Sequence, residues 1–194
     1  MALTKIDASN VSDDAVNIAQ LGATGTPSAT TFLRGDNAWV TPDAGGITHA
    51  STWRLTADFT SYQDPITSNL AESTESFGAS MVESSGIFTF PVTGTWNVEY
   101  VVYGTNANYY YADIYVLKTI NDSAYTTAVA RRSTNSNSAQ GYGSNISFFF
   151  NVTDVTQCKC KFSIHTDAGT SLVTKGDASI NETYMNFIRL GDST

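Results

Sequence analysis

The stretch GIFTFPVTGTWNVEYVVYG (residues 86–104) decides the fold of this chain, because it reads as two strands joined by a tight reversal. Phe88 and Phe90 pack the first strand, and Pro91 ends it because proline has no N–H to donate to a sheet ladder. Gly94 permits the reversal. Alternate residues of the second strand share one face, and the face expected in the core holds Trp96, Val98, Tyr100 and Val102.

The same alternation recurs along the chain after residue 48. In CKCKFSIHT (158–166), one face holds Cys158, Cys160, Phe162 and Ile164. Further strands are predicted in residues 53–62, 109–120, 125–133, 145–152, 170–175 and 182–190. About eight to ten short strands, with almost no helical pattern, predict an all-β sandwich or jelly roll.

The cysteines and histidines carry no metal or disulfide signature. Residues at i and i+2 of a strand lie roughly 6.6–6.8 Å apart with parallel side chains, which suits a disulfide poorly. Cys158 and Cys160 are therefore expected to be free thiols that fill core space. His49 and His165 stand outside any motif, and we expect each to be exposed or locally hydrogen-bonded.

Composition excludes several classes of protein. The 194 residues carry a net charge of −8, only 14% are charged, and 12% are aromatic. So few cations argue against a nucleic-acid binder, and so many aromatic residues argue against general disorder. The sequence has no apolar run long enough to predict a membrane-spanning helix. The first ten residues, MALTKIDASN, lack the apolar segment of a secretory signal.

The first 48 residues differ from the rest of the chain. They are poor in aromatic residues and rich in turn formers, and a short helix is predicted over residues 13–22, capped by Ser12 and ended by Gly22. Gly45 and Gly46 are interpreted as a hinge. The predicted organisation is therefore an irregular attachment or linker segment, residues 1–48, followed by a head domain, residues 49–194.

The head resembles the globular head of complement component one-q. The resemblance begins with residues 86–104, and it continues in the same order through residues 112–125, 144–166 and 182–191, so that it covers about Trp53 to Gly191. Trp96 stands where the family usually has Tyr or Phe. The resemblance implies a ten-strand jelly roll, shared with tumour-necrosis-factor-like proteins, that assembles as a homotrimer.

A second resemblance lies in LGATGTPSATTFLRGDNAWVTP (21–42), which is similar to a segment of bacteriophage tail-fibre and related virion proteins. The residues that carry it are Gly25, Thr26, Pro27, Phe32, Leu33, Arg34, Gly35, Asp36 and Trp39. It implies a virion appendage whose N-terminal segment binds other virion proteins. Within it, Arg34-Gly35-Asp36 is interpreted as a turn rather than an integrin-binding tripeptide.

Two sets of residues are candidates for function in such a head. SFFFNV is apolar on both strand faces, which predicts that a second copy of the chain covers it, and the candidate trimer-interface residues are Phe148, Phe150, Tyr184 and Phe187. Polar, tyrosine-rich loops suit a host-surface glycan or protein, and the candidate contacts are Asn108, Tyr109, Tyr111, Asn135, Asn137 and Tyr142. The tyrosine cluster could equally lie at the trimer interface.

The functional hypothesis is a bacteriophage tail-fibre or appendage tip, located in the virion, that binds a host receptor. The alternatives are a decoration protein that stabilises the particle and a non-viral, lectin-like secreted protein. No catalytic motif is present, so an enzyme is not expected. No cofactor is expected either, although residues 119–123 and 175–182 offer oxygen ligands for a structural calcium ion.

Overall fold

The computed structural model describes residues 22–42, 46–60, 62–105, 111–134, 141–166 and 172–194. The chain divides into two compact units, Met1–Gly45 and Gly46–Thr194, and the second is the head. Apart from Gly22, the helix predicted over residues 13–22 lies outside the described residues.

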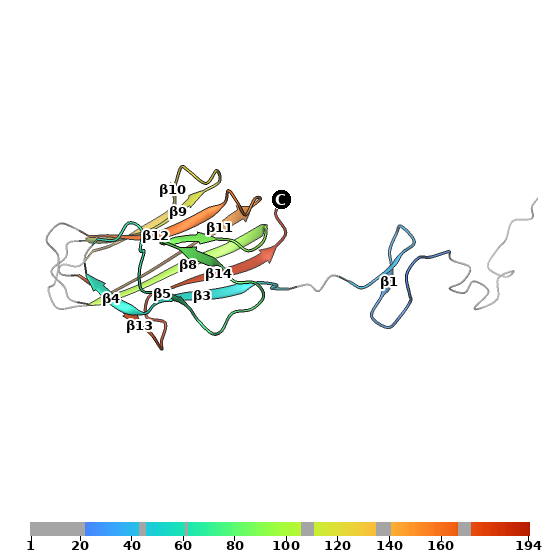
Figure 1. The fold of residues 1–194 in the computed structure, drawn as a ribbon, viewed down its shortest axis with the longest axis horizontal. Helices are drawn as coiled ribbons and strands as arrows, with labels where there is room; N and C mark the ends of the chain where they lie inside the picture. The colour runs from blue at the N-terminus through green and yellow to red at the C-terminus, as the bar shows by residue number, and fades with distance from the viewer. Residues whose placement is uncertain (1–21, 43–45, 61, 106–110, 135–140, 167–171) are drawn as a thin grey trace, which may run out of the picture. The chain divides into compact units, whose positions relative to one another are not determined.

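Two antiparallel sheets face each other in the head (Figure 1). The five-stranded sheet has the spatial order β10 (Thr126–Thr134), β9 (Tyr111–Thr119), β12 (Lys159–Thr166), β7 (Ile87–Thr89) and β6 (Val82–Ser84). The seven-stranded sheet has the order β4 (Ala57–Thr60), β13 (Val173–Asp177), β8 (Gly94–Thr105), β14 (Tyr184–Gly191), β3 (Ala50–Leu55) and β5 (Leu70–Glu72), and β11 (Tyr142–Val152) pairs with β8. The predicted all-β jelly-roll sandwich is confirmed. Three-residue strands such as β5 and β6 were too short to be recognised by alternation.

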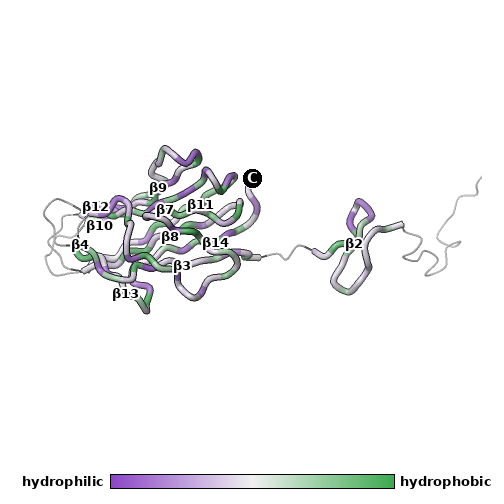
Figure 2. Tube along the Cα trace, viewed as in Figure 1, coloured by the Kyte–Doolittle hydropathy of each residue, from purple (hydrophilic) through white to green (hydrophobic). Residues whose placement is uncertain are grey.

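Alternation along β8 positions the rest of the seven-stranded sheet. The four β8 residues assigned to the core from the sequence are all buried, while their neighbours Asn97 and Glu99 lie on the opposite face. β11 pairs with β8 along its whole length, from Tyr142 opposite Gly104 to Val152 opposite Gly94. Figure 2 shows this alternation as hydrophobic and hydrophilic positions interspersed along the strands of the head.

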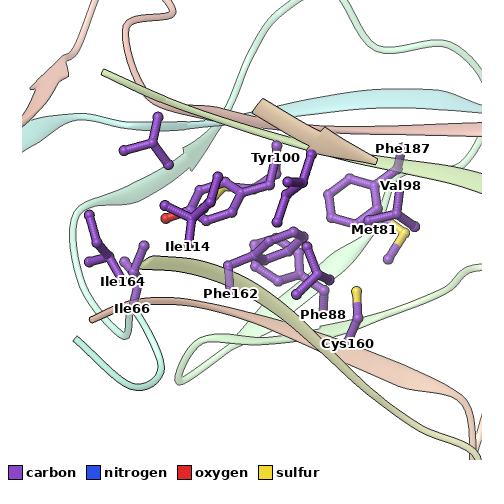
Figure 3. Close-up of a cluster of buried hydrophobic side chains, with 14 of the residues drawn as sticks. Ile66, Met81, Phe88, Val98, Tyr100, Ile114, Cys160, Phe162, Ile164 and Phe187 are labelled. Atoms are coloured by element: carbon purple, nitrogen blue, oxygen red, sulfur yellow. The ribbon is translucent and has the colours of Figure 1, made fainter. Parts of the chain in front are cut away.

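Aromatic rings from the two sheets meet in the core (Figure 3). Phe88 of β7 lies 5.3 Å from Phe162 in its own sheet and 5.2 Å from Phe187 of the facing sheet, measured between ring centroids. Phe90, which follows β7, meets Phe150 edge to face at 5.4 Å. Such offset and edge-on pairs add stability beyond the apolar area that they bury.

The two cysteines are part of this core, as the sequence predicts. Cys158 and Cys160 are free and buried, and Figure 3 shows the Cys160 sulfur among the aromatic side chains. Burial in these apolar surroundings raises the pKa of the Cys160 thiol far above its ordinary value.

Two glycines shape the turns on either side of β7. Gly86 has a φ of 80°, and a Cβ there would lie 2.3 Å from the carbonyl oxygen of Ile66. Gly94 has a φ of 147°, and its Cβ would lie 2.5 Å from the Arg189 Nε atom. Both backbone conformations are costly for residues with side chains, so the reversal that the sequence predicts at Gly94 depends on glycine.

We expect Phe88→Ala to lower the free energy of unfolding by about 3–5 kcal/mol, because it leaves a cavity where aromatic rings from both sheets meet. The matched control is Phe77→Ala, since the Phe77 side chain is 59% exposed and its loss is expected to change stability by no more than about 0.5 kcal/mol. Urea denaturation followed by circular dichroism measures both. Equal losses in the two variants would contradict the assignment of Phe88 to the core.

Candidate functional site

The first candidate surface is the outward side of β11, β8 and β14, which we call the β8 face. Its cross-strand rows are Phe149–Asn97–Ile188, Ser147–Glu99–Asn186 and Asn145–Val101–Tyr184. Phe149 is 71% exposed and Tyr103, at the end of β8, is 42% exposed. Open faces of antiparallel sheets normally carry polar residues, so apolar and aromatic side chains here indicate a surface that another molecule covers.

Hydrogen bonds run across the middle of the β8 face. Thr52 Oγ1 donates to Asn186 Oδ1 at 2.7 Å, and Asn186 Nδ2 donates to Glu99 Oε2 at 2.8 Å. A shallow groove of about 380 Å³ begins beside Glu99, and its lining includes Val101, Tyr103, Asn145, Tyr184 and, from β10, Arg131. The face therefore combines apolar side chains with groups already held in fixed positions.

The residues predicted for the trimer interface lie elsewhere, with one exception. Phe150 and Phe187 are 1% and 0% exposed in the core of a single chain, so they cannot form an interface between chains. Phe148 also points inward, where its ring lies 5.8 Å from that of Phe150. Only Tyr184 lies on the β8 face, where it lines the groove.

The physical reason for this correction is the two-residue period of a strand. In the run of three phenylalanines in β11, the first and third must share a face, and that face also carries buried Ile146 and Val152. The middle residue, Phe149, is therefore the outward one. Three consecutive apolar residues do not show which of them face the core. The sequence alone therefore did not identify Phe149 as the outward residue.

The second candidate surface is on the outward side of the five-stranded sheet, near the end at which β9 begins. We call it the histidine cluster and define it as Tyr62, Asp64, Asp113, Tyr115, Arg132, Lys161, Ser163 and His165. The strand register places His165 opposite Asp113 and Ser163 opposite Tyr115. Gln63 pairs with Ile164 through two 2.9 Å backbone hydrogen bonds, which brings Tyr62 and Asp64 alongside these residues.

An arginine–aspartate pair lies at one side of the cluster. The Asp113 carboxylate, on a residue 5% exposed, accepts bonds from Arg132 Nε at 2.7 Å and Nη2 at 2.6 Å. This two-bond geometry is the strongest form of such a pair. The hydrogen bonds from Arg132 hold the pKa of Asp113 below its usual value, against the opposing effect of burial.

An aromatic stack lies at the other side. The Tyr62 ring stacks on His165 with centroids 4.5 Å apart and 29° between planes, and the Tyr115 ring lies 4.5 Å from His165 as well. Asp64 accepts hydrogen bonds from Ser163 Oγ at 2.7 Å and from the Tyr62 hydroxyl at 3.2 Å. Although burial raises the pKa of Asp64, the Ser163 hydrogen bond and the charge of Lys161 outweigh it, so the pKa is lowered.

The predicted receptor-contact residues divide into three groups. Asn108, Tyr109, Asn135 and Asn137 lie outside the described residues. Tyr111 is half-buried at the start of β9, and the Arg132 guanidinium lies 4.4 Å from its ring centroid, so it adjoins the histidine cluster. The prediction for Tyr142 is wrong, because this residue is a buried part of β11.

Tyr142 is buried for a local steric reason. Its ring packs so closely over Gly104 that a Cβ there would lie 1.8 Å from the tyrosine Cε1 atom. Its hydroxyl also lies 3.0 Å from Thr174 Oγ1, within hydrogen-bond distance. The sequence analysis places Tyr142 in a polar, tyrosine-rich loop, whereas Gly104 opposite it in β8 makes room for a core side chain.

Sequence reasoning missed the histidine cluster. Alternation places Tyr115 on one face of β9 and His165 on one face of β12, but it does not show that these faces coincide. That requires the strand register, and it also requires Tyr62 and Asp64, which arrive from about a hundred residues away in the sequence. The usable signal was the set of polar residues opposite the core positions in residues 109–120 and 158–166.

The N-terminal motif forms a hairpin of β1 (Phe32–Leu33) and β2 (Trp39–Val40). Its turn contains Arg34-Gly35-Asp36, in which Arg34 Nε donates to Asp36 Oδ1 at 3.0 Å, as the turn interpretation predicts. Gly25 has a φ of 86°, and a Cβ there would lie 2.6 Å from the Trp39 carbonyl oxygen. A side chain at position 25 would therefore clash with the Trp39 backbone.

Side-chain oxygens in the two proposed calcium loops are used by the turns themselves. Asn121 Oδ1 accepts from the backbone N–H groups of Ser123 and Ala124, and Asp177 Oδ1 accepts from those of Ser179 and Ile180. Within the described ranges, no three His, Cys, Asp or Glu residues are grouped so that they could hold a metal ion. A structural calcium ion stays an untested prediction.

No helix capable of spanning a membrane occurs in the described part of the chain.

Comparison with known proteins identifies the fold. No protein-family model matches the chain, and no curated protein matches its sequence. Among solved structures, Eiger TNF from S. frugiperda matches with a TM-score of 0.57 and 9% identity, covering 75% of this chain and 94% of the Eiger chain. Murine APRIL at pH 5.0 matches with a TM-score of 0.55 and 11% identity, covering 73% of this chain and 99% of the APRIL chain. The head therefore has a tumour-necrosis-factor-like jelly-roll fold.

We expect acid to destabilise the head partly through Asp113. A carboxyl whose pKa is lowered by folding stabilises the folded state above its ordinary pKa of 3.8, and this contribution is lost as the pH falls below that value. Asp113→Asn should therefore reduce stability at pH 7 and flatten its decline between about pH 5 and pH 3. Urea denaturation across this range measures both effects.

Arg132→Lys is the matched variant, because it keeps the positive charge but cannot make both parallel bonds. Its stability is expected to lie between those of the wild type and Asp113→Asn at neutral pH. Identical pH profiles for the wild type and Asp113→Asn would contradict the assigned role of the pair.

Proposed function

We propose that this chain is the adhesive head subunit of a virion appendage, the tip of a bacteriophage tail fibre, which assembles as a homotrimer and binds a molecule on the host surface. The observation that carries the proposal is the pairing of two separate units. One bears the tail-fibre-like segment, residues 21–42, and the other is a tumour-necrosis-factor-like jelly roll with exposed apolar side chains on the β8 face. The proposed role is binding, without catalysis.

Trimer formation is supported by the β8 face. Phe149 and Tyr103 are exposed on the side of the sheet that faces away from the core. The groove lined by Val101 and Tyr184 lies on the same side and could accept side chains of a neighbouring chain. Burying a phenylalanine contributes about 1.5–3 kcal/mol, and a cyclic trimer would repeat that burial at each of its interfaces.

Attachment is supported by the N-terminal hairpin. Phe32 and Leu33 are 45% and 37% exposed on β1, beside a turn held by the paired Arg34 and Asp36. A small hairpin with exposed apolar residues is suited to packing against another virion protein. The head would then be free to face the host.

Host binding in such an assembly is multivalent. Three equivalent sites on one head, repeated over several appendages, raise the effective affinity without a deep pocket on any one chain.

The first test of this proposal is oligomeric state. We expect the full chain to have the mass of a trimer at micromolar concentration, as measured by light scattering after size-exclusion chromatography. Phe149→Glu should shift it to monomer, because the substitution places a charge in the apolar interface. Val82→Glu, at a 63% exposed valine of β6 in the other sheet, is the control and should leave the trimer intact. A monomeric wild type would refute the trimer.

The second test concerns host binding. The purified chain should block adsorption of the encoding virus to its host cells, because the free trimers occupy the receptors. Immunogold labelling of virions should place the chain at the appendage tips. Labelling of the particle surface without any block of adsorption would instead favour a decoration protein, and the absence of the chain from virions would refute the viral role.

A further inference from the structure

We infer that the histidine cluster is a carbohydrate-binding site that takes a neutral pyranose, with Tyr62 as the stacking platform and Asp64 as the hydrogen-bond acceptor. The inference rests on the proposed function in naming the host molecule as a glycan, and it assigns the contact to the five-stranded sheet rather than to the β8 face.

The Tyr62 ring is held as a flat, accessible platform. Its residue is 52% exposed even though one ring face stacks on His165 at 4.5 Å, so the opposite face is open to solvent. His165 is itself supported by Tyr115 at 4.5 Å. The platform is therefore rigid before any ligand arrives, which lowers the entropy cost of binding.

A polar group stands at the rim of this platform. Asp64 is 28% exposed in its side chain, and hydrogen bonds from Ser163 Oγ and the Tyr62 hydroxyl fix its orientation. The lowered pKa of Asp64 keeps it ionised near neutral pH, as a strong acceptor. A carboxylate has about four acceptor positions, so it can bind ligand hydroxyls in addition to its protein donors.

This pairing selects a class of ligand. A pyranose has an apolar C–H side that packs on an aromatic ring and hydroxyl groups at its edge that donate to a carboxylate. A purely apolar ligand would displace water from the Asp64 carboxylate without donating a hydrogen bond to it. That loss of hydration would weaken binding.

Charge balance selects a neutral sugar over an acidic one. Asp64 lies 3.7 Å from Lys161 Nζ and 3.5 Å from His165 Nε2, and Asp113 is paired with Arg132. Lys161 and Arg132 are thus each already paired with one of the two carboxylates of the cluster, Asp64 and Asp113. An anionic sugar would meet Asp64 without an uncommitted positive charge to compensate for the repulsion.

The position of the cluster suits contact with a surface. The cluster lies near the start of β9, and this end of the head is opposite the start of β3 and the C-terminus (Figure 1). Tyr62 and Asp64 lie between β4 and β5, and the backbone bridge between Gln63 and Ile164 ties them to β12. Three copies of a weak site, one in each chain, would act together on a glycan-covered surface.

The test uses the full chain and saturation-transfer NMR with methyl glycosides of glucose, galactose, mannose and N-acetylglucosamine. At least one should receive saturation at concentrations up to about 50 mM, which exceeds the roughly millimolar Kd expected of a single shallow site. Tyr62→Ala should abolish the transfer, and Asp64→Asn should weaken binding at least about tenfold. Phe77→Ala, at a 59% exposed phenylalanine that belongs neither to the histidine cluster nor to the β8 face, is the matched control and should bind as the wild type does.

Thermal unfolding of each variant checks that the head stays folded, and Tyr62→Phe gives a second readout. It keeps the platform but loses the hydroxyl bond to Asp64, so it should retain binding that Tyr62→Ala lacks. The inference is overturned if none of the four glycosides binds, if Tyr62→Ala binds as well as the wild type, or if only glucuronate or N-acetylneuraminate binds.

Adsorption assays separate this inference from the proposed function. If Tyr62→Ala protein blocks virus adsorption as well as the wild type, the head is an adhesin but its site lies elsewhere. If the glycoside binds through Tyr62 but wild-type protein does not block adsorption, the sugar site stands and the proposed host-binding role fails.

Discussion

The rest of the head depends on which alternate residues of one strand, β8, face the core. It pairs with β11 on one side and with β14 and β13 on the other, so its alternation is transmitted to most of the seven-stranded sheet. A shift of one residue would turn Trp96, Val98 and Tyr100 outward and carry Asn97 and Glu99 into the core. Burying the Glu99 carboxylate without a partner would destabilise the fold by more than any contacts of the shifted register could offset. The register of β8 is therefore strongly determined.

The same constraint separates what the sequence could predict from what it could not. Within a strand, alternation assigned the core correctly for Trp96, Val98 and Cys160 and identified the all-β sandwich. It failed at the three phenylalanines of β11, because consecutive apolar residues do not reveal which of them points outward. The prediction that Phe150 and Phe187 lie at an interface between chains was therefore wrong, because both fill the core of one chain.

Functional residues were harder to find than core residues, because they depend on pairings between distant segments. Tyr62 and His165 are brought together by a backbone bridge between Gln63 and Ile164, which no local pattern encodes. Each would be classified as an ordinary surface residue when read alone. The two outward faces also divide the work of the proposed head, since one carries apolar residues for self-association and the other carries polar and aromatic groups for a ligand.

The burial of both cysteines has a practical consequence. Cys158 and Cys160 are the only thiols of the chain, and both lie in the core between the sheets. A thiol-reactive reagent can reach them only when the sandwich opens, so the rate of labelling reports how often the core is exposed to solvent. These two thiols thus report the opening of the core without any introduced cysteine and without the removal of surface thiols.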